Sequence, residues 1–311
     1  MERKEIIHNL SNILGRRINI TTKIPISLDE KSKTLKLHVN VNGLVDNMQK
    51  DGSSVDSLAI CLKAILYKMI EKVEISWDNR TPESFIMRER RHYYRFLYRM
   101  VRFKQNFNWV ILKGTFPGGS KNFENEISHW VSNYPNGESQ TEARGREHIV
   151  EREICDLIQK RRDIVGFRQL PIGLFKERVE DREETSRTPG GGSGMDLWSI
   201  KDKTLTIYEL KVNNNKRIGI ISELCFYVYA MHDLSGHVIN YPQGADCPYR
   251  KTNLLIRAIN NNEIEQINAT LLFENAHPLI TQEVISLLNT NKSGIRFACQ
   301  TVQELRDELL S

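Results

Sequence analysis

The sequence predicts an α/β protein in which a mixed β-sheet flanked by helices follows an α+β N-terminal domain. Three observations support this prediction. The chain has 311 residues, which is enough for two domains. Pro and Gly cluster at residues 117–120 and 135–137, as is typical of turns and linkers. Beyond them, helix and strand patterns follow in an order that fits a mixed sheet. We therefore expect domains over residues 1–120 and 121–311.

The spacing of apolar residues predicts the elements of both domains. Alternation of apolar and polar residues indicates half-buried strands, and spacing of three or four indicates helices. In the first domain we expect strands at residues 35–41, 73–77 and 107–112 and helices at 53–73 and 82–104. In the second we expect strands at residues 165–171, 195–200, 205–212, 252–259, 267–273 and 295–299, and helices at 142–161, 217–232, 281–289 and the C-terminus.

The composition is that of an ordinary globular protein. Apolar residues make up 40% of the chain and the formal net charge is only +5, so evidence for nucleic-acid binding must come from local clusters. The first 17 residues lack the apolar core of a signal peptide, and no segment approaches the roughly 18 apolar residues of a membrane span. Five cysteines form no CxxC pair. We expect a cytoplasmic protein with reduced thiols and no membrane partner.

The segment 194–211 contains the most informative pattern. On the strand at residues 205–212, Glu209 and Lys211 share a face with Leu205 and Ile207. This face therefore changes from apolar to charged where the strand ends. Dry and unpaired charges there would be costly, so the strand end is a candidate site.

The turn before this strand gives the pattern a geometry. If Ile200 pairs with Leu205 in an antiparallel hairpin, Asp196 lies opposite Glu209, with Cβ atoms about 5 Å apart. A loop one residue shorter would shift this pairing. Two carboxylates that close repel each other unless a cation lies between them. Mg²⁺ suits such a site because it prefers oxygen ligands.

An Asp, a hairpin and a Glu-x-Lys sequence together resemble the PD-(D/E)XK nuclease superfamily, which has the restriction-endonuclease-like fold. The resemblance implies that Asp196 and Glu209 bind the metal and that Lys211 assists the attacking water. The carbonyl of Leu210 would be a further metal ligand. The implied activity is Mg²⁺-dependent hydrolysis of phosphodiester bonds, with Mn²⁺ able to replace Mg²⁺. Met195 departs from the motif, which has Pro there.

The first helix in this family often carries a glutamate that faces the site. In the segment 145–158, Glu147 falls within the apolar stripe of the helix, whereas Glu151 falls at its edge. We therefore expect Glu147 to be the catalytic and metal-binding helix carboxylate, with Glu151 as the alternative. Some branches of the family also carry Gln-x-x-x-Tyr on the next helix. Here Tyr227 matches the Tyr, but Glu223 replaces the Gln.

A basic helix at residues 88–104 is the strongest charge feature. Arg91, Arg95, Arg99 and Arg102 recur at helical spacing and would form one basic stripe. Such a stripe can bind a phosphate backbone. A solvated amphipathic helix packed by its aromatic residues, or a surface for a protein partner, explains the pattern equally well.

The resemblance favours DNA over RNA as the substrate, because most of the family acts on DNA. It implies a DNA endonuclease in restriction or anti-phage defence. The alternative is a non-catalytic module that retains the nuclease fold and binds nucleic acid or protein. The N-terminal domain is a candidate surface for nucleic acid, for a protein partner or for a second copy of the chain.

Overall fold

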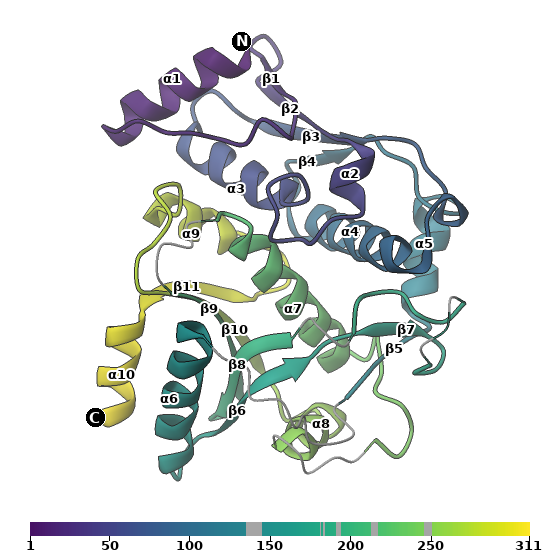
Figure 1. Ribbon diagram of the computed structural model, residues 1–311, viewed down its shortest axis with the longest axis vertical. Coiled ribbons are helices and arrows are strands. Elements are labelled where there is room, and N and C mark those ends of the chain that lie inside the picture. The colour runs from purple at the N-terminus through teal and green to yellow at the C-terminus, as the bar shows by residue number, and fades with distance from the viewer. Residues whose placement is uncertain (135–144, 181, 183, 191–193, 213–216, 246–250) are drawn as a thin grey trace. The chain divides into compact units, whose positions relative to one another are not determined.

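The computed structural model describes residues 1–134, 145–180, 182, 184–190, 194–212, 217–245 and 251–311 (Figure 1). The chain forms two compact units. The first consists of Met1–Glu124, Arg217–Glu223 and His277–Lys292, and the second of Asn125–Lys216, Leu224–Ala276 and Ser293–Ser311. The first break lies close to the expected boundary at residue 120. The two later segments of the first unit are not part of the continuous domains that we expected. The expected turn at residues 135–137 lies outside the described residues.

The first unit contains a four-stranded sheet in the order β1-β2-β3-β4. Its strands are β1 (Ile26–Asp29), β2 (Thr34–Val39), β3 (Lys72–Trp77) and β4 (Val110–Leu112). Its helices are α1 (Arg3–Leu14), α2 (Val41–Leu44), α3 (Val55–Ile65), α4 (Met87–Asn106), α9 (Gln282–Leu288) and the 3₁₀ turn Pro82–Ser84. Only β1 and β2 pair antiparallel, because α3 and α4 return the chain between parallel strands. This unit therefore has β-α-β crossovers and not the expected α+β organisation.

The second unit contains a five-stranded mixed sheet in the order β11-β10-β9-β8-β6. These strands are β6 (Val165–Pro171), β8 (Gly194–Lys201), β9 (Thr204–Lys211), β10 (Gln266–Phe273) and β11 (Arg296–Thr301). Strands β9, β10 and β11 run parallel, whereas β8 pairs antiparallel with both β6 and β9. A separate antiparallel pair joins β5 (Trp130–Ser132) to β7 (Leu174–Lys176). Helix α5 (Ser120–Ile127) contains the break between the units.

Helices α6 (Arg146–Lys160), α8 (Thr252–Asn260) and α10 (Val302–Leu310) belong to this unit, and α7 (Ile220–Ser235) begins in the first unit and continues in the second from Leu224. Helices α6 and α10 lie side by side (Figure 1) and share one apolar core with β8, β9 and β10. That core includes Val150 and Ile154 from α6, Leu197 from β8 and Leu305 from α10. The expected mixed sheet flanked by helices is thus confirmed at the level of the α/β class.

The segment 252–259 is helix α8, so the predicted strand there is wrong. Its buried residues include Thr252, Leu255, Ile256 and Ile259, which have the i, i+3, i+4, i+7 spacing of one helical face. The topology also requires a long return path at this place. Because β9 and β10 are parallel, the chain must cross from the end of one to the start of the other, and parallel strands are usually connected through helices.

None of the four described cysteines forms a disulfide. Cys61, Cys155 and Cys225 are buried and Cys299 is exposed, while Cys247 lies outside the described residues. Among the described helices, none is both long and apolar enough to cross a membrane.

The basic stripe predicted on α4 is wrong for Arg99. The Arg99 guanidinium is buried and forms a two-point ion pair with Asp56 of α3, in which Nε lies 3.1 Å from Oδ2. Its Nη2 also donates to the Ser53 carbonyl at 2.9 Å. Ser222 donates its hydroxyl to the same Asp56 carboxylate, which links the segment 217–223 to the core of the first unit. Arg99 therefore has a structural role.

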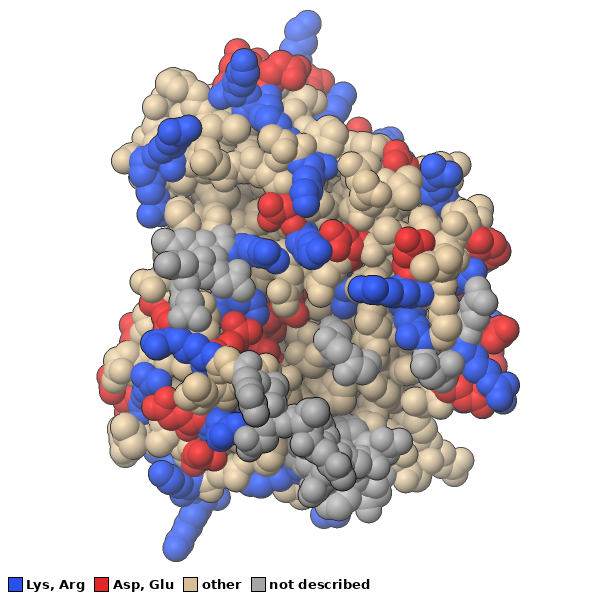
Figure 2. Space-filling model, viewed as in Figure 1, with Lys and Arg blue, Asp and Glu red and all other residues tan. Residues whose placement is uncertain are grey.

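Arg95 is likewise buried, and its Nη2 donates to Nδ1 of His92 at 2.7 Å. Burial, and secondly the charge of Arg95, lower the pKa of His92 to about 4, so the ring is neutral near pH 7 and can accept this hydrogen bond. Arg91 and Arg102 stay partly exposed. On the face drawn in Figure 2, basic and acidic side chains are interspersed. A continuous basic stripe from Arg91 to Arg102 is therefore not present on α4.

We predict that Arg99→Ala lowers the free energy of unfolding by about 3–5 kcal/mol, because it leaves the Asp56 carboxylate buried and unpaired. Urea denaturation followed by tryptophan fluorescence measures this loss. Arg88→Ala, in the exposed first turn of the same helix, is the control and should change stability by less than about 0.5 kcal/mol. Equal effects of the two substitutions would contradict a structural role for Arg99.

Candidate metal centre

The β8–β9 hairpin has the register that the sequence predicts. Ile200 pairs with Leu205, and the ladder runs from the pair Lys201–Thr204 to the pair Leu197–Tyr208. Asp202 and Lys203 form the turn with φ values of 46° and 61°, as in the type I′ turns that suit two-residue hairpins.

One step beyond this ladder, Asp196 and Glu209 follow at the open end of the hairpin. The backbone N–H of Leu210 donates to Asp196 Oδ2 at 2.8 Å, which fixes the Asp196 carboxylate beside β9. The hairpin therefore brings the Asp and the Glu-x-Lys sequence together.

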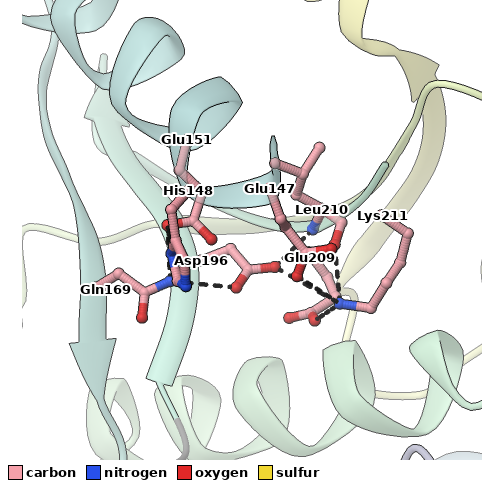
Figure 3. Close-up of polar contacts among 8 residues, drawn as sticks. All are labelled: Glu147, His148, Glu151, Gln169, Asp196, Glu209, Leu210 and Lys211. Carbon is pink, nitrogen blue, oxygen red and sulfur yellow. Dashed lines mark hydrogen bonds and ion pairs between the residues drawn. The ribbon is translucent and has the colours of Figure 1, made fainter. Parts of the chain in front are cut away.

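Lys211 is the cationic centre of the site. Its side chain is only 5% exposed, and its Nζ lies 2.8 Å from both Glu209 Oε1 and the Leu210 carbonyl oxygen. The same Nζ lies 3.7 Å from Glu147 Oε1 and 3.9 Å from Asp196 Oδ2. Figure 3 shows these oxygens turned toward the ammonium group. Lys211 thus contacts the four oxygen-bearing residues that the sequence resemblance assigned to a metal ion.

Both candidate glutamates of α6 face the site, but their burial reverses the expected order. Glu151 is 0% exposed, whereas the side chain of Glu147 is 34% exposed. The apolar stripe also includes Cys155, which is buried and widens the stripe, so that Glu151 falls within it and not at its edge. Glu147 lies in the first turn, where the helix covers less of the core. The prediction that Glu151 lies at the edge of the stripe is therefore wrong.

The two oxygens of Glu151 have different surroundings. Oε2 accepts a hydrogen bond from Gln169 Nε2 at 2.8 Å and lies 3.1 Å from His148 Nδ1. Arg168 Nη1 is 3.9 Å from the same oxygen. Oε1 is buried without a hydrogen-bond partner among the described residues. A buried carboxylate oxygen in this state is costly, and a bound cation would remove the cost.

The carboxylates form a compact cluster of oxygen donors. One oxygen each from Glu147, Glu151 and Asp196 lie within 4.8 Å of one another. Among the ion pairs of the described residues, Lys211 contacts Glu147, Asp196 and Glu209, and Arg168 lies 3.9 Å from Glu151, so that four carboxylates meet two cationic side chains. The excess of negative charge and the oxygen ligands fit Mg²⁺ or Mn²⁺ better than Zn²⁺.

Gln169 is a site residue that the sequence did not indicate. The β6–β8 register pairs Arg168 with Leu197 and Leu170 with Met195, so Gln169 lies across from Asp196. Its Nε2 is 3.5 Å from Asp196 Oδ1. The long connection between β6 and β8 prevents this register from being derived from sequence spacing, unlike that of the short β8–β9 hairpin.

Three more residues were named from the sequence, and they lie on β8 and on α7. Met195 is buried in β8. Glu223 and Tyr227 are both buried on α7.

Comparison of the chain with protein-family models, with curated proteins and with solved structures gives no match. The α/β class therefore comes from the observed topology. The resemblance to PD-(D/E)XK nucleases comes from the hairpin and helix residues alone.

We predict that Mn²⁺ raises the melting temperature of the wild-type protein and that Glu151→Gln removes most of this rise. The substitution takes away a buried ligand, and a ligand that binds only the folded state stabilises it according to its affinity. Glu147→Gln should have a smaller effect because Glu147 is partly exposed. Thermal unfolding with and without Mn²⁺ measures both.

Asp156→Asn is the matched control, because Asp156 lies on the same helix and is exposed. This variant should keep the full rise in melting temperature. A full rise in Glu151→Gln as well would exclude Glu151 from the metal centre.

Proposed function

We propose that the second unit is a divalent-cation-dependent nuclease that hydrolyses phosphodiester bonds, with DNA as its substrate. One observation carries the proposal: α6, β8 and β9 bring Glu151, Asp196, Glu209 and Lys211 together, and among the described residues the buried Oε1 of Glu151 has no hydrogen-bond partner. Building such a cluster costs folding free energy, and its net negative charge suits a divalent cation.

The candidate ligands are Asp196, Glu209, the Leu210 carbonyl and the two glutamates of α6. A divalent cation held by them would polarise a phosphate group and lower the pKa of a bound water. The Leu210 N–H keeps the Asp196 carboxylate in place. This bond leaves the Asp196 side chain little freedom to turn away from the cluster.

Four carboxylates alone would repel a phosphate group. The positive charge of Lys211 offsets part of this repulsion. Its ammonium group donates to Glu209 and to the Leu210 carbonyl. When these oxygens bind a cation, the ammonium group can donate to the attacking water or to a phosphate oxygen, where it stabilises the negative charge that develops. An intact set of two acids and a lysine supports catalysis over a non-catalytic module, because such a module has no need for this set. A role in restriction or anti-phage defence follows from the sequence resemblance.

We predict that Asp196→Asn and Glu209→Gln each reduce Mg²⁺-dependent nicking of plasmid DNA by at least about 100-fold, through loss of a metal ligand. Both substitutions are isosteric and remove a buried negative charge, so the variants should remain folded. Conversion of supercoiled to open-circular plasmid measures the rate, and circular dichroism checks the fold.

Lys201→Ala is the control for the hairpin, because Lys201 lies at the end of β8 that is remote from the carboxylates and is exposed. It should cut at the wild-type rate. Wild-type cutting by Asp196→Asn, or cutting by all proteins in excess EDTA, would reject the proposed function.

We predict cutting in Mg²⁺ and in Mn²⁺, and binding without turnover in Ca²⁺. The ligands are oxygens, which all three ions accept, but the looser coordination of Ca²⁺ holds the water and phosphate less well. Parallel nicking assays at equal concentrations of the three chlorides measure this order. Turnover in Ca²⁺ equal to that in Mg²⁺ would contradict the prediction.

A further inference from the structure

Gln169 has an unusual backbone conformation for a residue inside a β-ladder. Its φ is +53°, in the left-handed region that residues other than glycine adopt only at a cost in free energy. The neighbouring pairs on both sides, Arg168–Leu197 and Leu170–Met195, keep the regular register of β6 and β8. The irregularity is therefore confined to the residue whose side chain reaches the carboxylate cluster.

The side chain of Gln169 contacts two carboxylates. Nε2 lies 2.8 Å from Glu151 Oε2 and 3.5 Å from Asp196 Oδ1. Both neighbours are acceptors, so the NH₂ end of the amide must face them. A neutral amide separates the two carboxylates without adding a charge, whereas a lysine or arginine there would compete with a cation.

The hydrogen bond from Gln169 also selects between the two oxygens of Glu151. Gln169 and His148 both contact Oε2 (Figure 3), and Oε1 keeps no hydrogen-bond partner among the described residues. One oxygen of a fully buried carboxylate is thus anchored, while the other is turned toward the Asp196 side chain (Figure 3).

We propose that Gln169 is a positioning residue of the metal centre: its left-handed backbone directs the amide onto Glu151 Oε2, which presents Oε1 to a divalent cation shared with Asp196. This inference rests on the proposed function in so far as the cluster binds a divalent cation. Partners that orient metal ligands typically change metal affinity by about 10- to 100-fold when they are removed.

A double-mutant cycle on the full chain tests the proposal, with Mn²⁺ affinity measured by isothermal titration calorimetry. The variants are Gln169→Gly, Glu151→Gln and the double substitution. Glycine adopts a positive φ without strain, so Gln169→Gly removes the amide and spares the backbone. We expect Gln169→Gly to weaken Mn²⁺ binding by about 10- to 100-fold. In the Glu151→Gln background, Gln169→Gly should weaken Mn²⁺ binding by less than about threefold. The reason is that the effects of substitutions at two coupled residues do not add.

Two further variants separate positioning from folding. Asn262→Gly also replaces a residue of positive φ in this unit, but in the exposed turn between α8 and β10, and should bind Mn²⁺ as the wild type does. Gln169→Asn is the second test variant, because Asn tolerates the left-handed conformation but is one methylene shorter. It should weaken Mn²⁺ binding in the same direction as Gln169→Gly.

Wild-type affinity in Gln169→Gly, or an equal loss in the Glu151→Gln background, would overturn the inference and leave the proposed function untouched. A wild-type protein that binds Mn²⁺ through Glu151 and Gln169 but never cuts DNA would overturn the nuclease proposal alone. Absence of any Mn²⁺ binding by the wild-type protein would overturn both.

Discussion

The turn at Asp202 and Lys203 sets the register on which the candidate metal centre depends. Successive residues of a strand point to opposite faces, so a slip of one residue would turn Glu209 and Lys211 to the other side of the sheet. Two consecutive left-handed residues close the hairpin tightly and fix the pair Ile200–Leu205. The position of every ligand on β8 and β9 follows from this pairing. The strands β10 and β6 then hold the hairpin in place from either side.

Charge balance is the second constraint on the site. Several carboxylates converge at one end of the sheet, and Lys211 is the buried cation that offsets part of their repulsion. Gln169 and His148 offer hydrogen bonds to Glu151, and the Leu210 N–H does the same for Asp196. These donors keep the carboxylates apart without neutralising them. The cluster thereby retains an excess of negative charge, which is the property that a divalent cation requires.

The first unit shows how a buried ion pair can organise distant parts of a chain. Asp56 accepts hydrogen bonds from Arg99 on α4 and from Ser222, which is more than 160 positions away. Gly219 lies in the same segment, and a Cβ at this position would come within 2.3 Å of the Gln49 carbonyl oxygen. Close backbone approach and the shared carboxylate together explain why residues 217–223 belong to this unit. The arginine spacing that suggested a phosphate-binding stripe instead reflects this internal packing.

The sequence by itself determined the candidate triad of Asp196, Glu209 and Lys211, because strand alternation and a short turn are local and fix which side chains meet. Most strands and helices were predictable for the same reason. The tertiary structure alone decided the buried position of Glu151, the contribution of Gln169 and the helical state of residues 252–259. These features depend on which segments pack together and on the register of strands joined by long connections. The spacing of neighbouring residues does not encode these features. A long connection between two strands is compatible with many registers, so its length does not select one of them.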